Sequence, residues 1–230
     1  MIELRHLVKR FHCITIRTLA SLIGLIIHAF NAVTYGQLHY RNLEKDQIKH
    51  PRLNYDGFNA FMTVSEASKS DIKWWLENVE LENGKLIRQS YVNEWLQTDA
   101  SLKGWGAICN QNYIGERWSS EESNHHINYL EPLAIFLGLK SFYKNVSDKH
   151  VGIKSDNSTA VAYINNMGGM QSNKLDDLAI TIWSWCKERS IFLTAVHVPG
   201  VENTGADYKS RIVNDSHEWM LKKDIFVTSV

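Results

Sequence analysis

The sequence predicts an α/β domain, a mixed five-stranded sheet with flanking helices, preceded by a mainly helical segment. Two observations carry this prediction. Three short strand patterns follow one another between about residues 91 and 118, and strand and helix patterns then alternate as far as Asp207. In the first 90 residues, apolar side chains recur instead at helical spacing. We therefore divide the chain into a helical segment (1–90), the α/β domain (91–213) and a C-terminal tail (214–230).

The first 90 residues contain an apolar stretch, Leu19 to Phe30, which follows several basic residues as in a signal peptide. This stretch is too short to cross a bilayer, which needs about 20 residues. Leu19, Leu22, Ile23 and Ile26 also fall on one helical face. We therefore expect a buried helix rather than a signal or a membrane anchor.

A second helix is expected from Ser65 or Ser68, either of which can cap it, through to about Glu80. Asn83-Gly84, a hairpin-type turn signal, is expected to close the helical segment.

The predicted domain begins with an antiparallel meander and continues with alternating elements. The expected elements, in order, are strands at 91–98, 104–109 and 113–118, a helix from about Tyr129, a strand at 151–155, helices at 158–167 and about 175–186, a strand at 191–198, and a short final helix. Gly168-Gly169 and Pro199-Gly200 provide the stops after two of these elements.

Composition excludes several classes of protein. An apolar fraction of 44% and a charged fraction of 22% are typical of a globular protein and exclude disorder. The net charge is zero, but residues 1–52 carry eight Lys/Arg against three acids, whereas residues 91–230 carry 13 basic and 16 acidic side chains. The basic front end either contacts phosphate groups or is a solvated helix surface. The three cysteines form no CxxC pair, which predicts an intracellular protein, in the cytoplasm or nucleus, without a zinc site or disulfides.

Four acidic residues lie where the predicted fold would bring them together. Asp99 closes the first strand, Glu131 lies in the first turn of the following helix, Asp156 follows the fourth strand, and Asp207 lies on the last helix. Strand ends and helix starts at one edge of a sheet are where ligand sites collect in α/β proteins. A carboxylate cluster suits Mg²⁺, which prefers oxygen ligands, and two such ions assist phosphodiester hydrolysis.

Around these acids the sequence resembles a known family. The segments TDASLKGWGA, INYLEPLA, IKSDNSTAVAYIN and HVPGVENTGADYKSR resemble the successive motifs of the RNase H domain linked to reverse transcriptases. The likeness is greatest to gypsy-like and DIRS-like (tyrosine-recombinase) retrotransposons and covers about half of the chain. The runs IRTLASLIGLIIHAFNAVTYGQLHYRNLE and SKSDIKWWLENV are similar, less specifically, to the thumb or connection region that precedes this domain.

The resemblance implies metal-dependent endonucleolytic hydrolysis of the RNA strand of an RNA–DNA hybrid. It implies that Asp99 bridges two Mg²⁺ ions, for which Mn²⁺ can substitute. Glu131 and Asp156 would complete one ion site, and Asp207 would help to hold the second. The implied partners are the hybrid and the polymerase part of the parent element, with no membrane.

Two departures from the family pattern matter. The loop PGVENTGAD has no histidine, unlike that of cellular RNases H, and His197 lies before the loop as an expected structural residue. Pro132 directly follows Glu131 and is expected to fix the start of its helix, where proline is tolerated.

Several further residues are candidates for contact with nucleic acid, each with an alternative. Asn157 and Ser158 either contact the substrate backbone or cap the next helix. Asn203 is either an N-cap or a contact to an RNA 2′-hydroxyl, and Lys209 and Arg211 are candidate phosphate contacts. The Trp74-Trp75 and Trp183/Trp185 pairs are expected in cores and interfaces rather than as base-stacking platforms.

Two other functions remain open from the sequence. A catalytically silent remnant would keep the fold only to bind nucleic acid or a protein partner. Another nuclease of the same fold, such as an integrase or a Holliday-junction resolvase, would use a related acidic cluster on DNA. Cleavage of a panel of substrates separates these alternatives.

Overall fold

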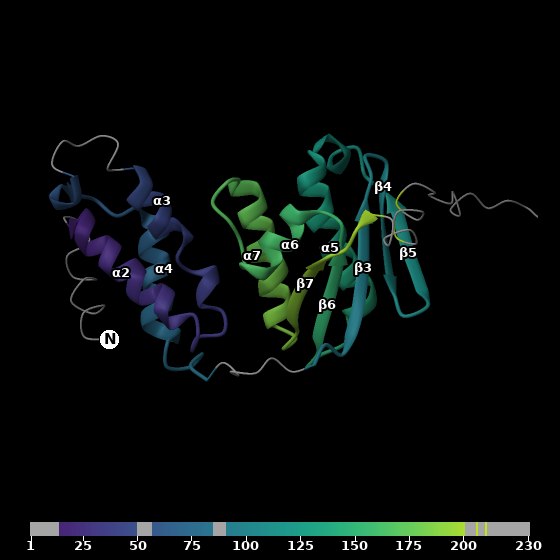
Figure 1. Ribbon diagram of the computed structural model, residues 1–230, viewed down its shortest axis with the longest axis horizontal. Coiled ribbons are helices and arrows are strands. Elements are labelled where there is room, and N and C mark those ends of the chain that lie inside the picture. Colours follow the sequence, from purple (N-terminus) through teal and green to yellow (C-terminus); the bar gives the residue numbers. More distant parts are fainter. Residues whose placement is uncertain (1–13, 50–56, 85–90, 201–205, 207–209, 211–230) are drawn as a thin grey trace, which may run out of the picture.

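The computed structural model describes residues 14–49, 57–84, 91–200, 206 and 210 (Figure 1). The first part of the chain forms a helical unit, which we call the N-terminal unit, residues 14–84. Its elements are β1 (Ile14–Thr15), α2 (Ile16–Ala29), η1 (Gly36–Leu38), α3 (Arg41–Lys49), η2 (Gly57–Asn59), β2 (Phe61–Met62) and α4 (Glu66–Asn78).

Helix α2 is the buried helix that the apolar stretch predicts. The Thr15 side chain caps it by accepting a hydrogen bond from the Thr18 backbone N–H at 3.2 Å. Its buried face, including Leu19 and Leu22, packs in the hydrophobic core of the N-terminal unit. Leu43 of α3 and Trp75 of α4 belong to the same core. In the described parts of the chain, no helix combines the length and the hydropathy needed to cross a membrane.

Helix α4 begins at the first of the two predicted caps, because the Ser65 side chain accepts from the Ser68 backbone N–H at 3.2 Å. Asn83-Gly84 ends the described part of this unit, and because residues 85–90 lie outside the described residues, the turn signal stays a prediction. Asn83 forms an isolated antiparallel bridge with Val33, which joins the end of this unit to the segment after α2.

The second part of the chain contains a mixed five-stranded sheet, which confirms the predicted fold class. The sheet order is β5-β4-β3-β6-β7, antiparallel between β3, β4 and β5 and parallel between β3, β6 and β7. The strands are β3 (Glu94–Ala100), β4 (Gly104–Cys109), β5 (Asn112–Arg117), β6 (His150–Ser155) and β7 (Phe192–His197). The connecting helices are η3 (Glu122–Asn124), α5 (Ile127–Tyr143), α6 (Ser158–Asn165) and α7 (Asn173–Lys187).

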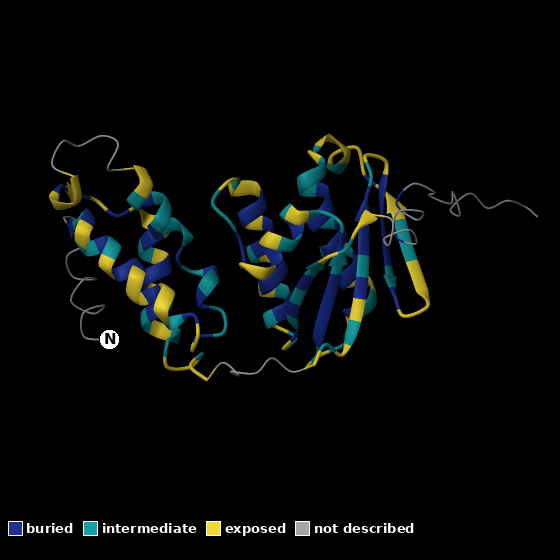
Figure 2. Cartoon of the chain, in the orientation of Figure 1, coloured by how far each residue is buried: buried dark blue, intermediate teal, exposed yellow. Residues whose placement is uncertain are grey.

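The long helix α5 packs directly on β3 and β4, and the inner strand β6 is buried whereas much of β5 is exposed (Figure 2). Gly138 permits the close approach of α5, because a Cβ at this position would lie 3.0 Å from the Cβ of Ala107 on β4. Helix α7 lies on the side of the domain that faces the N-terminal unit (Figure 1). Trp75 and Trp183 are fully buried, as expected for core residues.

Pro132 does not fix the start of its helix, so that prediction is wrong. Helix α5 begins at Ile127, two residues earlier than expected, and Pro132 lies inside it as its sixth residue. His126 caps the helix, since its ring Nδ1 accepts from the Asn128 backbone N–H at 3.2 Å. Histidine is not among the preferred capping residues, which is why the sequence did not reveal this start. Because proline has no N–H, the carbonyl of Asn128 loses the hydrogen bond that position 132 would otherwise donate.

Candidate active site

Three of the four predicted acidic residues converge at one edge of the sheet. Asp99 is the penultimate residue of β3, Asp156 follows the last residue of β6, and Glu131 is the fifth residue of α5. Strands β3 and β6 are parallel neighbours, so their carboxyl ends lie side by side. One ligand oxygen from each residue can be chosen so that all three lie within 4.8 Å of one another.

Glu131 is the most electrostatically constrained member of this cluster. It is only 4% exposed, and its Oε2 atom has no hydrogen-bond partner among the described residues. Burial, reinforced by the charges of Asp99 and Asp156, raises the pKa of the Glu131 carboxyl to about 9, although a hydrogen bond from the Ala100 backbone opposes the shift. Without a compensating positive charge, this carboxyl therefore retains its proton at neutral pH.

These observations fit a hard divalent cation. All three side chains offer carboxylate oxygens, the ligand type that Mg²⁺ and Mn²⁺ prefer. A cation among them would offset the mutual repulsion and give the unpartnered oxygen of Glu131 a partner.

Asp99 is held in place by a residue that the sequence did not single out. The Ser210 hydroxyl donates a 2.6 Å hydrogen bond to Asp99 Oδ2, and Ser101 donates to the Ser210 carbonyl at 2.7 Å. Ser210 and Ala206 are helical and fully buried. The other predicted residues of this segment, Asp207, Asn203, Lys209 and Arg211, lie outside the described residues.

Asn157 is a helix cap. Its Oδ1 accepts from the Ala160 backbone N–H at 3.0 Å and so begins α6. Its side-chain N–H also donates to Asn128 Oδ1 at 3.4 Å, which joins the starts of α6 and α5. Ser158 is the exposed first residue of α6. His197 is structural in this geometry, because its Nε2 donates to the Asp156 carbonyl at 3.0 Å and holds the end of β7 beside the end of β6.

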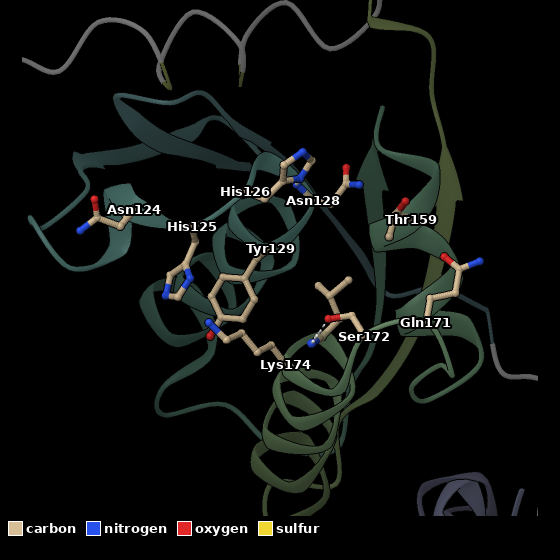
Figure 3. Close-up of a pocket in the computed structure, with 10 residues that line it drawn as sticks. Asn124, His125, His126, Asn128, Tyr129, Thr159, Gln171, Ser172 and Lys174 are labelled. Carbon is tan, nitrogen blue, oxygen red and sulfur yellow. Dashed lines mark hydrogen bonds between the residues drawn. The ribbon is translucent and has the colours of Figure 1, made fainter. Parts of the chain in front are cut away.

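A polar pocket of about 440 Å³ (Figure 3) is lined by Asn128, whose side chain accepts a hydrogen bond from Asn157, the residue after Asp156 of the cluster. It collects the starts of three helices: His126 caps α5, Thr159 lies in the first turn of α6, and Ser172 caps α7. Lys174 adds a positive charge. Helix starts present backbone N–H groups and a partial positive charge, which favour anions. The sequence reading missed this pocket, although the capping position of Ser172 was a usable signal.

The sheet order, the covering helices and the carboxylate cluster together define an RNase H-like fold. Residues 93–183 match the family described as the RNase H-like domain found in reverse transcriptase. This part of the chain is therefore similar to the RNase H-like domains of reverse transcriptases. Among curated proteins, no sequence match was found.

Solved structures with a similar chain trace include RNases H and reverse transcriptases. RNase H1 from the halophilic archaeon Halobacterium salinarum is 12% identical, with 50% of this chain and 92% of that chain covered and a TM-score of 0.44. LC11-RNase H1 in complex with an RNA/DNA hybrid is 18% identical, with coverages of 51% and 93% and a TM-score of 0.44. The foamy viral protease-reverse transcriptase in complex with an RNA/DNA hybrid is 13% identical, with coverages of 96% and 30% and a TM-score of 0.33.

Proposed function

We propose that this chain is a ribonuclease H segment of a retroelement reverse transcriptase, of the gypsy-like or DIRS-like type, which hydrolyses the RNA strand of RNA–DNA hybrids. The observation that carries the proposal is the cluster of Asp99, Glu131 and Asp156, in which a deeply buried carboxylate keeps an unpartnered oxygen. A carboxylate in a surface ion pair or in contact with solvent would have a partner for each oxygen, so burial without a partner indicates a functional site.

The chain's own residues would hold the divalent ions and orient the hybrid. Asp99, fixed by Ser210, would lie between two ion sites, with Glu131 and Asp156 on one side. Asp207 would supply the fourth carboxylate. Ser210, three residues after Asp207, supports this assignment because its hydrogen bond to Asp99 brings this segment of the chain to the cluster. The bound ions, Mg²⁺ or Mn²⁺, would stabilise the charge that develops on the attacking and leaving oxygens of the phosphodiester.

The polar pocket would receive a backbone phosphate of the hybrid and thus set the register of the substrate at the cluster. Ser158 and the cap residue Asn157 lie at the edge of the cluster and are the described candidates for further substrate contacts. Lys209 and Arg211 would contact phosphates, and Asn203 an RNA 2′-hydroxyl.

The test is cleavage of a labelled RNA–DNA hybrid by wild type and by Asp99→Asn. Asparagine keeps the shape and an acceptor for Ser210 but removes the negative charge. Hydrolysis should fall by about a hundredfold or more, because cation stabilisation is worth several kcal/mol and each ~1.4 kcal/mol is a factor of ten. Glu116→Gln, which neutralises an exposed carboxyl on β5, is the matched control and should cleave like wild type.

The same assay separates the competing functions. EDTA should abolish cleavage, Mn²⁺ should restore it, and Ca²⁺ should support it poorly because Ca²⁺ prefers longer bonds and more ligands. Cleavage of DNA duplexes or junctions in place of the hybrid would identify an integrase-like or resolvase-like nuclease. Binding of the hybrid without cleavage under any metal would identify a silent remnant. An Asp99→Asn variant within a few-fold of wild type would refute the assigned site.

A further inference from the structure

Helix α7 is held by the N-terminal unit at both of its ends. Near its start, Lys45 Nζ of α3 lies 2.9 Å from Asp176 Oδ2, and the Asp176 side chain is only 5% exposed. At its end, Lys187 Nζ lies 2.5 Å from Glu82 Oε1, in a more exposed position. Lys187 follows Asp176 by eleven positions, about 16 Å along a helix. The two ion pairs therefore act at well-separated points of one interface.

The ion pair near the start differs from the other because Asp176 also holds the turn between α6 and α7. Its Oδ1 accepts a hydrogen bond from the Gly169 backbone N–H at 3.2 Å. The preceding residue, Gly168, has φ +129°, and a Cβ there would collide with the same oxygen. The turn thus packs closely against the buried Asp176 carboxylate, and Gly168 has a backbone conformation that only glycine adopts easily.

This turn continues into a wall of the polar pocket. Gln171, Ser172 and Lys174, which follow it directly, line the pocket (Figure 3). The Ser172 backbone N–H donates to the Tyr163 hydroxyl at 3.2 Å, so the turn is also attached to α6. A displacement of Gly169 would therefore be transmitted to the pocket wall within three residues.

Helix α3 holds the other end of the same turn. Arg41, one helical turn before Lys45 and on the same face, donates from Nη2 to the Asn166 carbonyl at 3.4 Å. Asn166 is the C-cap of α6, where a cation is favoured by the helix dipole. One face of α3 thus contacts the α6–α7 turn at both its beginning and its end.

We propose that Lys45 and Asp176 are positioning residues, through which the N-terminal unit fixes the α6–α7 turn and thereby the pocket wall that receives the substrate. The inference rests on the proposed function for its effect on the substrate, but its structural step, from Lys45 through Asp176 to Gly169, does not. The N-terminal unit then stabilises the structure of the substrate site, in addition to any contact that it makes with the substrate itself. Without Lys45, the buried Asp176 would lose its counter-charge and turn toward solvent, which would release Gly169.

The test compares two ion pairs of the same interface in the full-length chain. Lys45→Met and Asp176→Asn break the pair at the turn, Glu82→Gln and Lys187→Met break the distant pair, and Lys45→Arg preserves the charge. The first readout is hydrogen exchange of the Gly169 amide without substrate. The second is the split between KM and kcat for hybrid cleavage.

We expect Lys45→Met to accelerate exchange at Gly169 and to raise KM, each by about fivefold, the factor that one ordinary hydrogen bond represents. The kcat value should stay within about twofold of wild type, because the pocket holds substrate away from the reacting phosphodiester. Adding Asp176→Asn to Lys45→Met should raise KM no further, since both changes break one interaction. Lys45→Arg should restore wild-type values, and the Glu82 and Lys187 variants should leave Gly169 and KM unchanged.

Unchanged exchange at Gly169 in Lys45→Met would overturn the proposal. So would faster exchange without a change of KM, or an equal rise of KM in both pairs, which would indicate a general effect of docking. If wild type cleaves no hybrid, the proposed function fails, and the exchange data alone still decide whether Lys45 controls the turn.

Discussion

At the scale of single residues, burial raises the pKa of two carboxyl groups whose surroundings differ. Burial raises the pKa of both Glu131 and Asp71, to about 9 and about 6 respectively. The neighbouring charges of Glu131 are further acids, which leaves an electrostatic need that a cation would satisfy. Asp71 accepts instead a hydrogen bond from the Asn42 backbone N–H at 3.3 Å and has nearby charges of both signs, Asp176 and Lys45, which marks it as a structural group.

We expect the ionised Asp71 carboxylate to lower the stability of the folded protein at neutral pH. Its pKa is higher in the folded state than the ~3.9 of an unfolded chain, so the unfavourable contribution is absent below pH 4, grows between pH 4 and 6, and is complete above pH 6. Asp71→Asn should therefore raise the free energy of unfolding by about 1–3 kcal/mol at pH 8 and by almost nothing at pH 3.5. Urea unfolding at the two pH values measures this difference.

Glu77→Gln, which changes an exposed acid on the same helix, is the matched control and should have little effect at either pH. Equal effects of Asp71→Asn at both pH values would contradict the electrostatic explanation, because they would show that packing and not charge was altered.

At the scale of elements, the short helix α6 connects the acidic cluster with the N-terminal unit. It begins at the Asn157 cap beside Asp156 and ends at Asn166, which Arg41 of the N-terminal unit contacts. A helix of this length gains little from its own propensity, so its position depends on its ends. Changes at either end are therefore expected to reach the site.

Asn157→Ala should lower the free energy of unfolding by about 1 kcal/mol, since it removes the hydrogen bond to the Ala160 backbone N–H. Asn157→Ser keeps a capping oxygen and should recover most of that loss. Measuring cleavage on both variants then separates the two functions left open for this residue. If both lose activity alike, Asn157 contacts the substrate; if serine restores activity, its function is to cap the helix.

At the scale of the whole molecule, the N-terminal unit and the RNase H-like domain share an interface of mixed character. Besides the two ion pairs, Leu38 packs in the core of the domain, and Tyr35 meets Trp183 edge-on with ring centroids 6.3 Å apart. Lys187 Nζ lies 5.1 Å from the centre of the Tyr35 ring. Because this contact buries apolar as well as charged groups, the two parts are expected to unfold cooperatively.

A chain reduced to residues 91–230 should therefore be less stable than the full chain. Loss of Leu38 and its neighbours exposes apolar surface worth roughly 2 kcal/mol, which should appear as a lower midpoint in thermal unfolding. The truncated domain should also show a higher KM that depends less steeply on salt, because the basic residues of the front half are gone. A truncated protein with unchanged midpoint and unchanged salt dependence would show that the N-terminal unit contributes nothing to the domain.

Most of the helices and strands, and the order of the acidic residues along them, follow from local patterns in the sequence. Alternation of strand and helix patterns revealed the five strands of the mixed sheet, because each element buries one face and its periodicity shows which. The helical face of Leu19 and Leu22 predicted a buried helix for the same reason. The start of α5 was missed because His126, a residue without strong capping preference, provides the cap.

Contacts between groups that are distant in the sequence become visible only in the folded structure. The hydrogen bond from Ser210 to Asp99 joins positions 111 residues apart, and the ion pair of Lys45 with Asp176 joins positions 131 residues apart. Periodicity and capping are properties of neighbouring residues, whereas such contacts depend on how whole elements pack. The raised pKa of Glu131 belongs to the same category, because burial and the proximity of other charges exist only once the chain has folded.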